Sequence, residues 1–326
     1  MKTYLTYDDV NIVPKFSEVL SRDDVELSTR FTKNTELRLP IVSSPMDTVT
    51  EVDMVIEMMD RGGVGVLHRF NTIEEQSKMM KEVHHEWDKY FNIGDGKERS
   101  ADNDYDEWYK RLHGRTPNES DFKDLREDYG MFTDSMAEDD RYWRHRPLCA
   151  AIGTTGDYLE RAKELVKNGC NVLLIDVAHG HHKLVGDALE EIKKNISRVE
   201  VVAGNIATRE GAEFLLQSGA DGIRVGIGNG SLCETRIRTG VGLPQVSTLL
   251  DVVTICDDFD VPCIADGGIR NIGDVCKGLG CGADSVMLGS LLSGTKESPG
   301  DIEKVGQWPN EKLFKKYRGS ASRDSK

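Results

Sequence analysis

The sequence predicts an α/β fold, a closed (β/α)8 TIM barrel in which helices cover a parallel sheet. Three observations support this fold class. Short apolar runs recur eight times, segments with helical periodicity separate them, and most of the runs end in Gly, Asp, Asn or His. Continuous apolar runs are typical of parallel strands that are buried on both faces. Eight such units within 326 residues favour one closed barrel over an open doubly wound sheet.

The eight predicted strands share a short apolar core that is followed by a turn residue. We expect them at residues 39–44, 63–68, 148–153, 171–178, 199–204, 222–226, 261–266 and 284–290. Helices are predicted where apolar residues repeat every three or four positions, at residues 157–169, 208–219 and 245–257. The first two of these segments end at a glycine, which is a common helix stop signal.

One region, residues 81–146, interrupts the alternation of strands and helices. It is dense in charged and aromatic side chains and lies between the second and third predicted strands. We therefore predict a largely helical, exposed insertion, with the barrel formed by residues 1–80 and 147–326. The aromatic and basic cluster at 141–146 is either an interaction surface or a small satellite core packed on the barrel.

Composition restricts the possible partners. The net charge of −14 disfavours a nucleic-acid-binding surface, which would need a basic stripe. No apolar run approaches the roughly 18 residues of a membrane span, and Asp8 and Asp9 occupy the place where a signal peptide has its apolar core. The seven cysteines are scattered without a Cys-x-x-Cys pair, as expected of reduced thiols. We expect a cytoplasmic protein with no nucleic-acid or membrane partner.

The glycine-rich stretch 226–235 is the strongest candidate for a functional loop. Its glycines allow a ligand to approach the backbone closely, and its exposed amides together with Ser231 could hold a phosphate. Cys233 would then lie close to the anchored ligand, where Arg236 and Arg238 could favour its thiolate. The alternative is a tight turn followed by an inert, buried cysteine.

Two further loops extend this phosphate hypothesis. In a (β/α)8 barrel the active site lies at the carboxyl ends of the strands, and the loops after strands seven and eight usually bind phosphate. Here these loops contain residues 266–268 and 289–290, and both are expected to precede helix N-termini, which favour anions. With Ser231, three neighbouring loops would converge on one phosphate.

Polar residues at other strand ends could line the same pocket. Asp176 and Asn205 end the fourth and fifth predicted strands on one face. Asp266 could accept hydrogen bonds from ribose hydroxyls or, alternatively, cap the following helix. The histidines at 179–182 could suggest a metal cluster, but no carboxylate or cysteine stands at ligand spacing beside them. We expect them to lie in a solvent-facing loop.

An ordered set of motifs resembles the family of inosine-5′-monophosphate (IMP) dehydrogenase and guanosine-5′-monophosphate (GMP) reductase. The resemblance covers about residues 1–80 and 147–322. Its motifs are residues 5–10, 21–29, 43–51, 226–235, 239–245, 266–268, 287–290 and 317–319.

This resemblance implies roles for individual residues. Cys233 would attack C2 of the purine, and Thr235 would assist at the same site. The candidate substrate-binding residues are Ser231, Asn205, Asp266, Gly267, Gly268, Gly289, Ser290, Tyr317 and Gly319, with Asp266 at the ribose. The nicotinamide cofactor would lie near Ser44, Asp176, Gly226 and Gly228. A potassium ion would bind the backbone carbonyls of Gly226, Gly228 and Cys233.

The resemblance leaves the branch of the family open. In the dehydrogenase, hydride passes from IMP to NAD and water hydrolyses the covalent intermediate to xanthosine monophosphate (XMP). In the reductase, ammonia leaves GMP and NADPH delivers hydride. Residues 44–51 and 62–69 favour the dehydrogenase, whereas 238–242 and the lack of regulatory modules favour the reductase. A nucleotide-binding protein without turnover is the third hypothesis, and the family implies a homotetramer.

Three departures from the family pattern accompany the resemblance. The insertion at 81–146 does not resemble the pair of cystathionine-β-synthase-like modules that often stands there, so adenine-nucleotide regulation is not implied. Ser-Ala-Ser follows Gly319 in place of the usual methionine that contacts the base. Residues 291–326 contain no segment like the mobile flap with its later Glu or Gln. We therefore expect a fragment, a flap supplied by another segment or partner, or incomplete activity.

Overall fold

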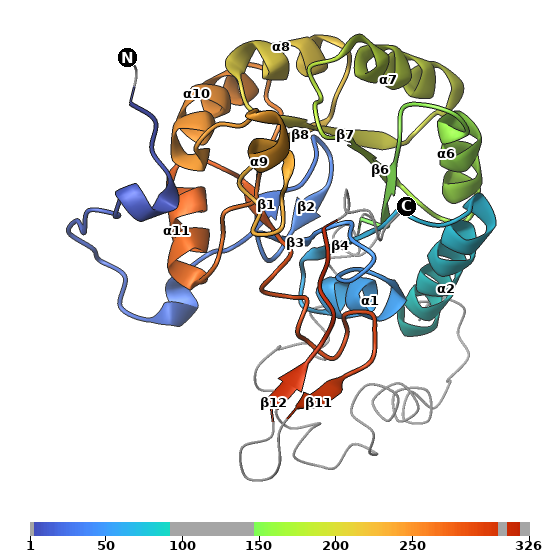
Figure 1. Ribbon diagram of the computed structural model, residues 1–326, viewed down its shortest axis with the longest axis horizontal. Coiled ribbons are helices and arrows are strands. Elements are labelled where there is room, and N and C mark those ends of the chain that lie inside the picture. The colour runs from blue at the N-terminus through green and yellow to red at the C-terminus, as the bar shows by residue number, and fades with distance from the viewer. Residues whose placement is uncertain (1–2, 92–146, 306–311, 320–326) are drawn as a thin grey trace.

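The computed structural model describes residues 3–91, 147–305 and 312–319, and its centre is a closed barrel of parallel strands ringed by helices (Figure 1). The strands follow one another around the barrel in the order β10-β3-β4-β5-β6-β7-β8-β9. This arrangement confirms the predicted (β/α)8 fold class.

All eight predicted strands are present. They are β3 (Ile41–Ser43), β4 (Val64–Leu67), β5 (Cys149–Ile152), β6 (Val172–Asp176), β7 (Glu200–Ile206), β8 (Gly222–Val225), β9 (Cys263–Asp266) and β10 (Ser285–Leu288). Only β7 passes its predicted end, because it continues beyond Gly204 through a shift in its register with β8.

The apolar runs are continuous because successive side chains enter two different cores. In β6, Leu173 and Ile175 pack toward the surrounding helices, whereas Val172 and Leu174 belong to the cluster inside the barrel. Each buried Leu or Ile side chain contributes about 1.5–3 kcal/mol relative to an exposed one. A strand that faces apolar surroundings on both sides has no polar alternation to show in its sequence.

The helices outside the barrel include the three that periodicity predicts. The described helices are α1 (Val52–Asp60), α2 (Ile73–Phe91), α6 (Tyr158–Lys167), α7 (Lys183–Asn195), α8 (Arg209–Gln217), α9 (Thr235–Thr239), α10 (Gln245–Asp258) and α11 (Ile272–Gly280). Gly169 and Gly219 take positive φ angles just after α6 and α8, as expected of glycines that end helices. None of the described helices combines the length and the apolar composition that crossing a bilayer requires.

A short hairpin closes the amino-terminal end of the barrel. It is formed by β1 (Thr29–Arg30) and β2 (Glu36–Leu37), and it places Phe31 in the barrel's inner core. Glu200, the first residue of β7, accepts hydrogen bonds from the hydroxyls of Thr32 and Thr35 at 2.6 and 2.7 Å. With this end closed, the carboxyl ends of the strands form the accessible rim.

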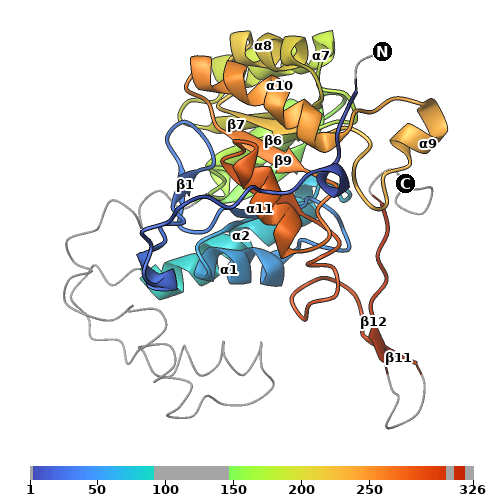
Figure 2. The ribbon, with the colours of Figure 1, turned by 90° about the vertical axis from the view of Figure 1, so that its left-hand side faces the viewer.

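Outside the barrel lie two short 3-10 helices, η1 (Tyr7–Asp9) and η2 (Arg22–Asp24), and a second hairpin. This hairpin, β11 (Glu303–Val305) with β12 (Lys312–Phe314), projects away from the barrel (Figure 2). From β12 the chain returns to the rim through residues 315–319.

The start of the predicted insertion falls inside a barrel helix. Helix α2 continues from Ile73 to Phe91, and both Met80 and Val83 are fully buried in the core between strands and helices. The rest of the predicted insertion, including the cluster at 141–146, lies outside the described residues.

The helix expected directly after β10 is absent from the described residues, so this prediction is wrong. Residues 289–300 form turns instead, in which the amides of Leu292 and Ser293 both return to the carbonyl of Gly289. The stretch contains Gly294, Pro299 and Gly300, and glycine and proline disfavour continued helix.

Candidate active site

Polar side chains gather where β6, β7 and β9 end. Asp176 and Asp266 are the last residues of β6 and β9, and Asn205 lies near the end of β7. The amide of Asn205 donates to Asp266 Oδ2 at 2.6 Å and to the carbonyl of Gly226 at 2.7 Å. The structure therefore brings together four of the predicted site residues.

Arg224 links the two carboxylates at the centre of this group, and the sequence analysis missed it. Its guanidinium lies 2.5 Å from Asp176 Oδ1 and 3.0 Å from Asp266 Oδ2, and the side chain is only 9% exposed. Burial alone would lower the pKa of Arg224, but the neighbouring Asp266 and Asp176 raise it above its ordinary value. The only available signal was one Arg within the otherwise apolar run 222–226.

Asp266 does not cap the helix that follows it, so that alternative is wrong. Helix α11 begins later and is capped by Asn271, whose side-chain oxygen accepts from the amide of Asp274 at 3.0 Å. Asp266 instead holds Asn205 and Arg224 at the rim. It is thus placed among the candidate ligand-binding groups.

The glycine-rich loop packs tightly on the loop after β9. Gly226 has a φ of 143°, and a Cβ atom there would lie 2.0 Å from the carbonyl oxygen of Asp266. At Gly267 the added Cβ would lie 2.9 Å from the amide nitrogen of Gly230. Side chains at either position would separate the two loops, which explains why glycine stands there.

Gln245, at the start of α10, fixes this loop from behind. Its side-chain amide donates to the carbonyl of Val225 at 2.8 Å, and its oxygen accepts from Asn229 at 2.6 Å. The loop's path is therefore set by a buried glutamine as well as by its glycines.

Cys233 is half-buried, which argues against the inert, buried cysteine. Its amide donates to the carbonyl of Gly230 at 3.0 Å, and Thr235 begins α9 on the same loop. By contrast, Cys149 and Cys170 are buried, and desolvation raises the pKa of Cys170 to about 12. Arg238, one of the two arginines expected near Cys233, pairs with Glu234.

The third predicted loop meets the chain that returns from β12. A Cβ atom on Gly289 would lie 2.9 Å from the hydroxyl of Tyr317 and 3.5 Å from Ser44 Oγ. Tyr317 also hydrogen-bonds Ser231, while burial raises the pKa of its phenol. Gly319 lies beside the loop of Cys233, since its added Cβ would be 3.0 Å from the carbonyl of Leu232.

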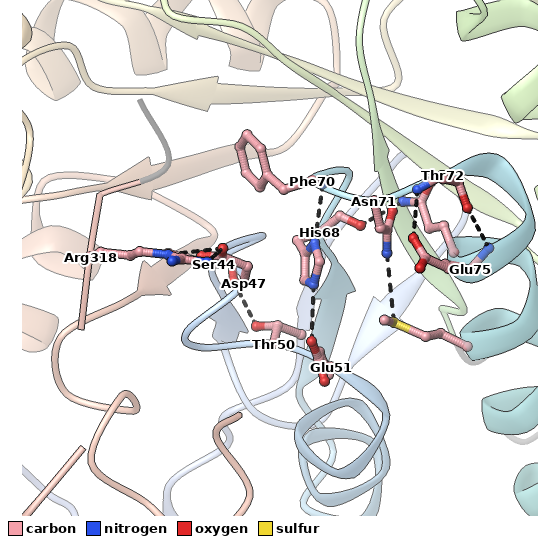
Figure 3. A network of polar contacts seen from close by, with 12 residues as sticks. Ser44, Asp47, Thr50, Glu51, His68, Phe70, Asn71, Thr72, Glu75 and Arg318 are labelled. Carbon is pink, nitrogen blue, oxygen red and sulfur yellow. Dashed lines mark hydrogen bonds and ion pairs between the residues drawn. The ribbon is translucent and has the colours of Figure 1, made fainter. Parts of the chain in front are cut away.

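Residues after β3 and β4 form the other side of the rim (Figure 3). His68 is 3% exposed, and its Nδ1 accepts from the amide of Phe70 at 3.2 Å. Its Nε2 therefore carries the proton and donates to Glu51 at 3.3 Å, a tautomer assigned from these two contacts. Arg69 follows, with Nε 3.7 Å from Asp176 Oδ2. Glu51, His68 and Arg69 stand within 44–51 and 62–69, the stretches that favour the dehydrogenase, but the sequence analysis gave none of them a role of its own.

The histidines at 179–182 lie in an exposed loop, as expected. His182 Nδ1 accepts from the amide of Leu184 at 3.1 Å and thereby caps α7. Across the described residues no group of three or more His, Cys, Asp or Glu side chains is placed to hold a metal ion.

The candidate potassium ligands all lie on the glycine-rich loop. Backbone carbonyls are the groups with which proteins replace the hydration shell of K⁺. The carbonyl of Gly226 accepts from Asn205, which leaves a second lone pair. The donor set offered by Gly226, Gly228 and Cys233 is thus neutral oxygen, and it is compatible with a monovalent cation.

Fold and rim together define a (β/α)8-barrel protein with a cysteine on a glycine-rich loop at the carboxyl ends of its strands. The profile described as the IMP dehydrogenase / GMP reductase domain matches residues 4–326. The chain belongs to this family, whose named members are oxidoreductases.

Individual relatives include both branches of the family. An inosine-5′-monophosphate dehydrogenase of Cryptosporidium parvum is 40% identical over 98% of this chain and 74% of its own length. One of Nitrosopumilus maritimus is 36% identical over 98% of this chain and 80% of its own. A GMP reductase of Leishmania major is 35% identical over 91% of this chain and 76% of its own.

Proposed function

We propose that this protein is an IMP dehydrogenase, which converts IMP, NAD and water to XMP and NADH. One observation carries the proposal. The half-buried Cys233 lies on the loop whose Ser231 contacts Tyr317 beside Gly289, while Asp266 faces the same rim. A nucleophile, three glycine-containing turns and a ribose-type acceptor thus stand on neighbouring loops at one rim of the barrel. Dehydrogenases also form the majority of the named relatives.

The binding roles follow from the positions of the polar groups. The 5′-phosphate would be held by hydroxyls and amides of Ser231, Gly268, Gly289, Ser290 and Tyr317, with Gly267 and Gly319 keeping the loops close. The carboxylate of Asp266 would accept from the ribose hydroxyls, since Arg224 and Asn205 hold it in place. This arrangement directs the purine toward Cys233.

The chemistry would begin with the Cys233 thiolate, which adds to C2 of the purine. An NAD bound beside Ser44, Asp176, Gly226 and Gly228 would supply the acceptor for the hydride that leaves C2. Water then adds to the same carbon and loses a proton to the solvent, the carbon–sulfur bond breaks, and XMP leaves with the thiolate restored. The hydroxyl of Thr235 assists at this carbon from the start of α9.

The cofactor would lie on the side of the rim formed by Ser44, Asp176, Gly226 and Gly228. Asp176 is suited to accept from ribose hydroxyls because Arg224 and Arg69 orient its two oxygens. We also infer a bound potassium ion on the loop carbonyls, a homotetramer and a cytoplasmic location, in line with the family and with seven free cysteine thiols.

GMP reductase is the second candidate, favoured by relatives of that name that match 91% of this chain. The deciding experiment follows nicotinamide absorbance in potassium-containing buffer with IMP plus NAD, and separately with GMP plus NADPH. We expect a signal with IMP and NAD only. A signal in the other mixture alone would assign the reductase. Silence in both, with IMP still raising the melting temperature, would indicate a binding protein without turnover.

A further inference from the structure

Residues 315–319, here called the C-terminal strap, bridge three separate loops of the rim. Each of three side chains in the strap contacts a different barrel loop. Lys315 reaches the turns after β10, Tyr317 reaches the glycine-rich loop, and Arg318 reaches the loop after β3. The strap thus lies where the loops must meet.

Lys315 connects the strap to Ser290 through a chain of hydrogen bonds. Its ammonium donates to the carbonyls of Ser298 and Lys296 at 2.6 and 3.0 Å. The buried Ser298 donates to the carbonyl of Ser293 at 2.8 Å, and Ser293 donates to that of Ser290 at 3.0 Å. The position of Ser290 is therefore tied to Lys315.

Arg318 fixes the other end of the strap (Figure 3). Its Nε lies 3.0 Å from Asp47 Oδ2, and Nη2 pairs with the same oxygen. Asp47 is only 10% exposed, and its second oxygen is buried with no hydrogen-bond partner among the residues that the structure describes. A carboxylate that is largely buried depends strongly on the cation that pairs with it.

Tyr317 lies between these two anchors, with its hydroxyl on Ser231 and beside Gly289. A phenol on an unanchored segment would sample many positions, and its contact with a ligand would carry the entropic cost of ordering it. Because Lys315 and Arg318 anchor the strap on the two sides of Tyr317, most of this entropic cost is met before a ligand binds.

The geometry points to Lys315 and Arg318 as positioning residues that hold the Tyr317 hydroxyl, and with it Ser231 and Ser290, in the arrangement that recognises the 5′-phosphate. The inference rests on the proposed function, because it assumes a nucleoside monophosphate at this rim. It assigns the Asp47–Arg318 ion pair a specific task, the discrimination of a nucleotide from its nucleoside.

The test compares the binding of IMP with that of inosine by calorimetry, in the parent chain and in Arg318→Gln, Asp47→Asn and Arg318→Lys. We expect Arg318→Gln and Asp47→Asn each to weaken IMP about tenfold and to leave inosine unchanged. The double variant should be no worse than either single one, since both remove the same interaction. Arg318→Lys keeps the charge and should recover part of the loss. In turnover, KM for IMP should rise while kcat is nearly constant.

Lys316→Ala is the matched control, because this neighbouring side chain is 86% exposed and lies 3.6 Å from Glu303 on the projecting hairpin. It should bind IMP as the parent does. Equal losses for IMP and inosine, or unchanged IMP affinity in Asp47→Asn and Arg318→Gln, would overturn the inference. A failure of the proposed function shows instead in the parent chain, as the absence of IMP binding, and would remove the strap's role with it.

Discussion

At the scale of single residues, the site depends on a few side chains that each make more than one contact. Arg224 pairs with two carboxylates, and Asn205 donates to a carboxylate and to a carbonyl. Tyr317 contacts two loops. Replacing such a residue affects several groups at once. Two predictions belong to this scale.

The first concerns Cys233. Cys233→Ala removes the nucleophile but leaves the loop's hydrogen bond from backbone to backbone intact. We expect turnover to fall by about three orders of magnitude or more, with IMP affinity nearly unchanged. Steady-state rates and calorimetry measure the two quantities. A variant that turns over like the parent would exclude the covalent mechanism.

The second concerns Arg224. Arg224→Met leaves Asp176 and Asp266 close together without their shared cation, so the free energy of unfolding should fall by about 3–5 kcal/mol. Arg224→Lys keeps one charge but cannot bridge both carboxylates, and it should lose less. Urea unfolding provides the values. If Arg224→Met were as stable as the parent, the buried triad would be energetically unimportant.

At the scale of elements, the glycine-rich loop is shaped by close backbone contacts rather than by a helix or strand. Its path requires glycine at Gly226, where the loop after β9 leaves no room, and Gln245 holds it from α10. Its carbonyls are the proposed ligands of potassium. Both properties can be tested on the loop itself.

Gly226→Ala should be far more disruptive than Gly240→Ala. Both residues have positive φ, but the new Cβ meets the Asp266 carbonyl at Gly226 and nothing within 4 Å at Gly240. Gly240→Ala should cost only backbone strain, about 1–2 kcal/mol. Gly226→Ala adds a clash that displaces the loop, so activity should be lost as well. Equal effects of the two variants on melting temperature and rate would contradict this account.

Replacing potassium by lithium or choline at constant ionic strength should lower turnover. The loop carbonyls would then lack the cation that gathers them, so Cys233 would be positioned less well. IMP titrations at each salt measure rate and affinity. Identical rates in all salts would remove potassium from the proposal.

At the scale of the whole molecule, the two ends of the barrel have separate tasks. The amino-terminal end is closed by the β1–β2 hairpin, which Glu200 holds through Thr32, Asn34 and Thr35. Glu200→Ala should therefore lower the free energy of unfolding by about 2–4 kcal/mol while leaving KM for IMP unchanged. Urea unfolding and steady-state kinetics of the same variant measure the two quantities. A large change in KM would show that the two ends of the barrel are coupled.

The barrel could be predicted because its signals are local. Each buried parallel strand is a short apolar run, and each helix shows its own periodicity. The loops of Gly226, Asp266 and Gly289 could be placed at one rim for the same reason. The roles of Arg224 and of the Asp47–Arg318 pair could not be predicted, because each role depends on contacts with residues far away in the sequence. The helix predicted after β10 was wrong because the strand–helix alternation of a (β/α)8 barrel suggested it, although Gly294 and Pro299 disfavour a helix there.

Closure of the barrel has a consequence for the order in which the protein is made. The first barrel strand, β3, pairs with the last, β10, with Ile41 opposite Val286. During synthesis, one edge of β3 therefore remains without its neighbour until almost the whole barrel has left the ribosome, and chains released earlier expose that edge to aggregation. Tyr317 emerges later still. Under the proposed function, the chain would therefore gain its nucleotide site only after all eight barrel strands have emerged.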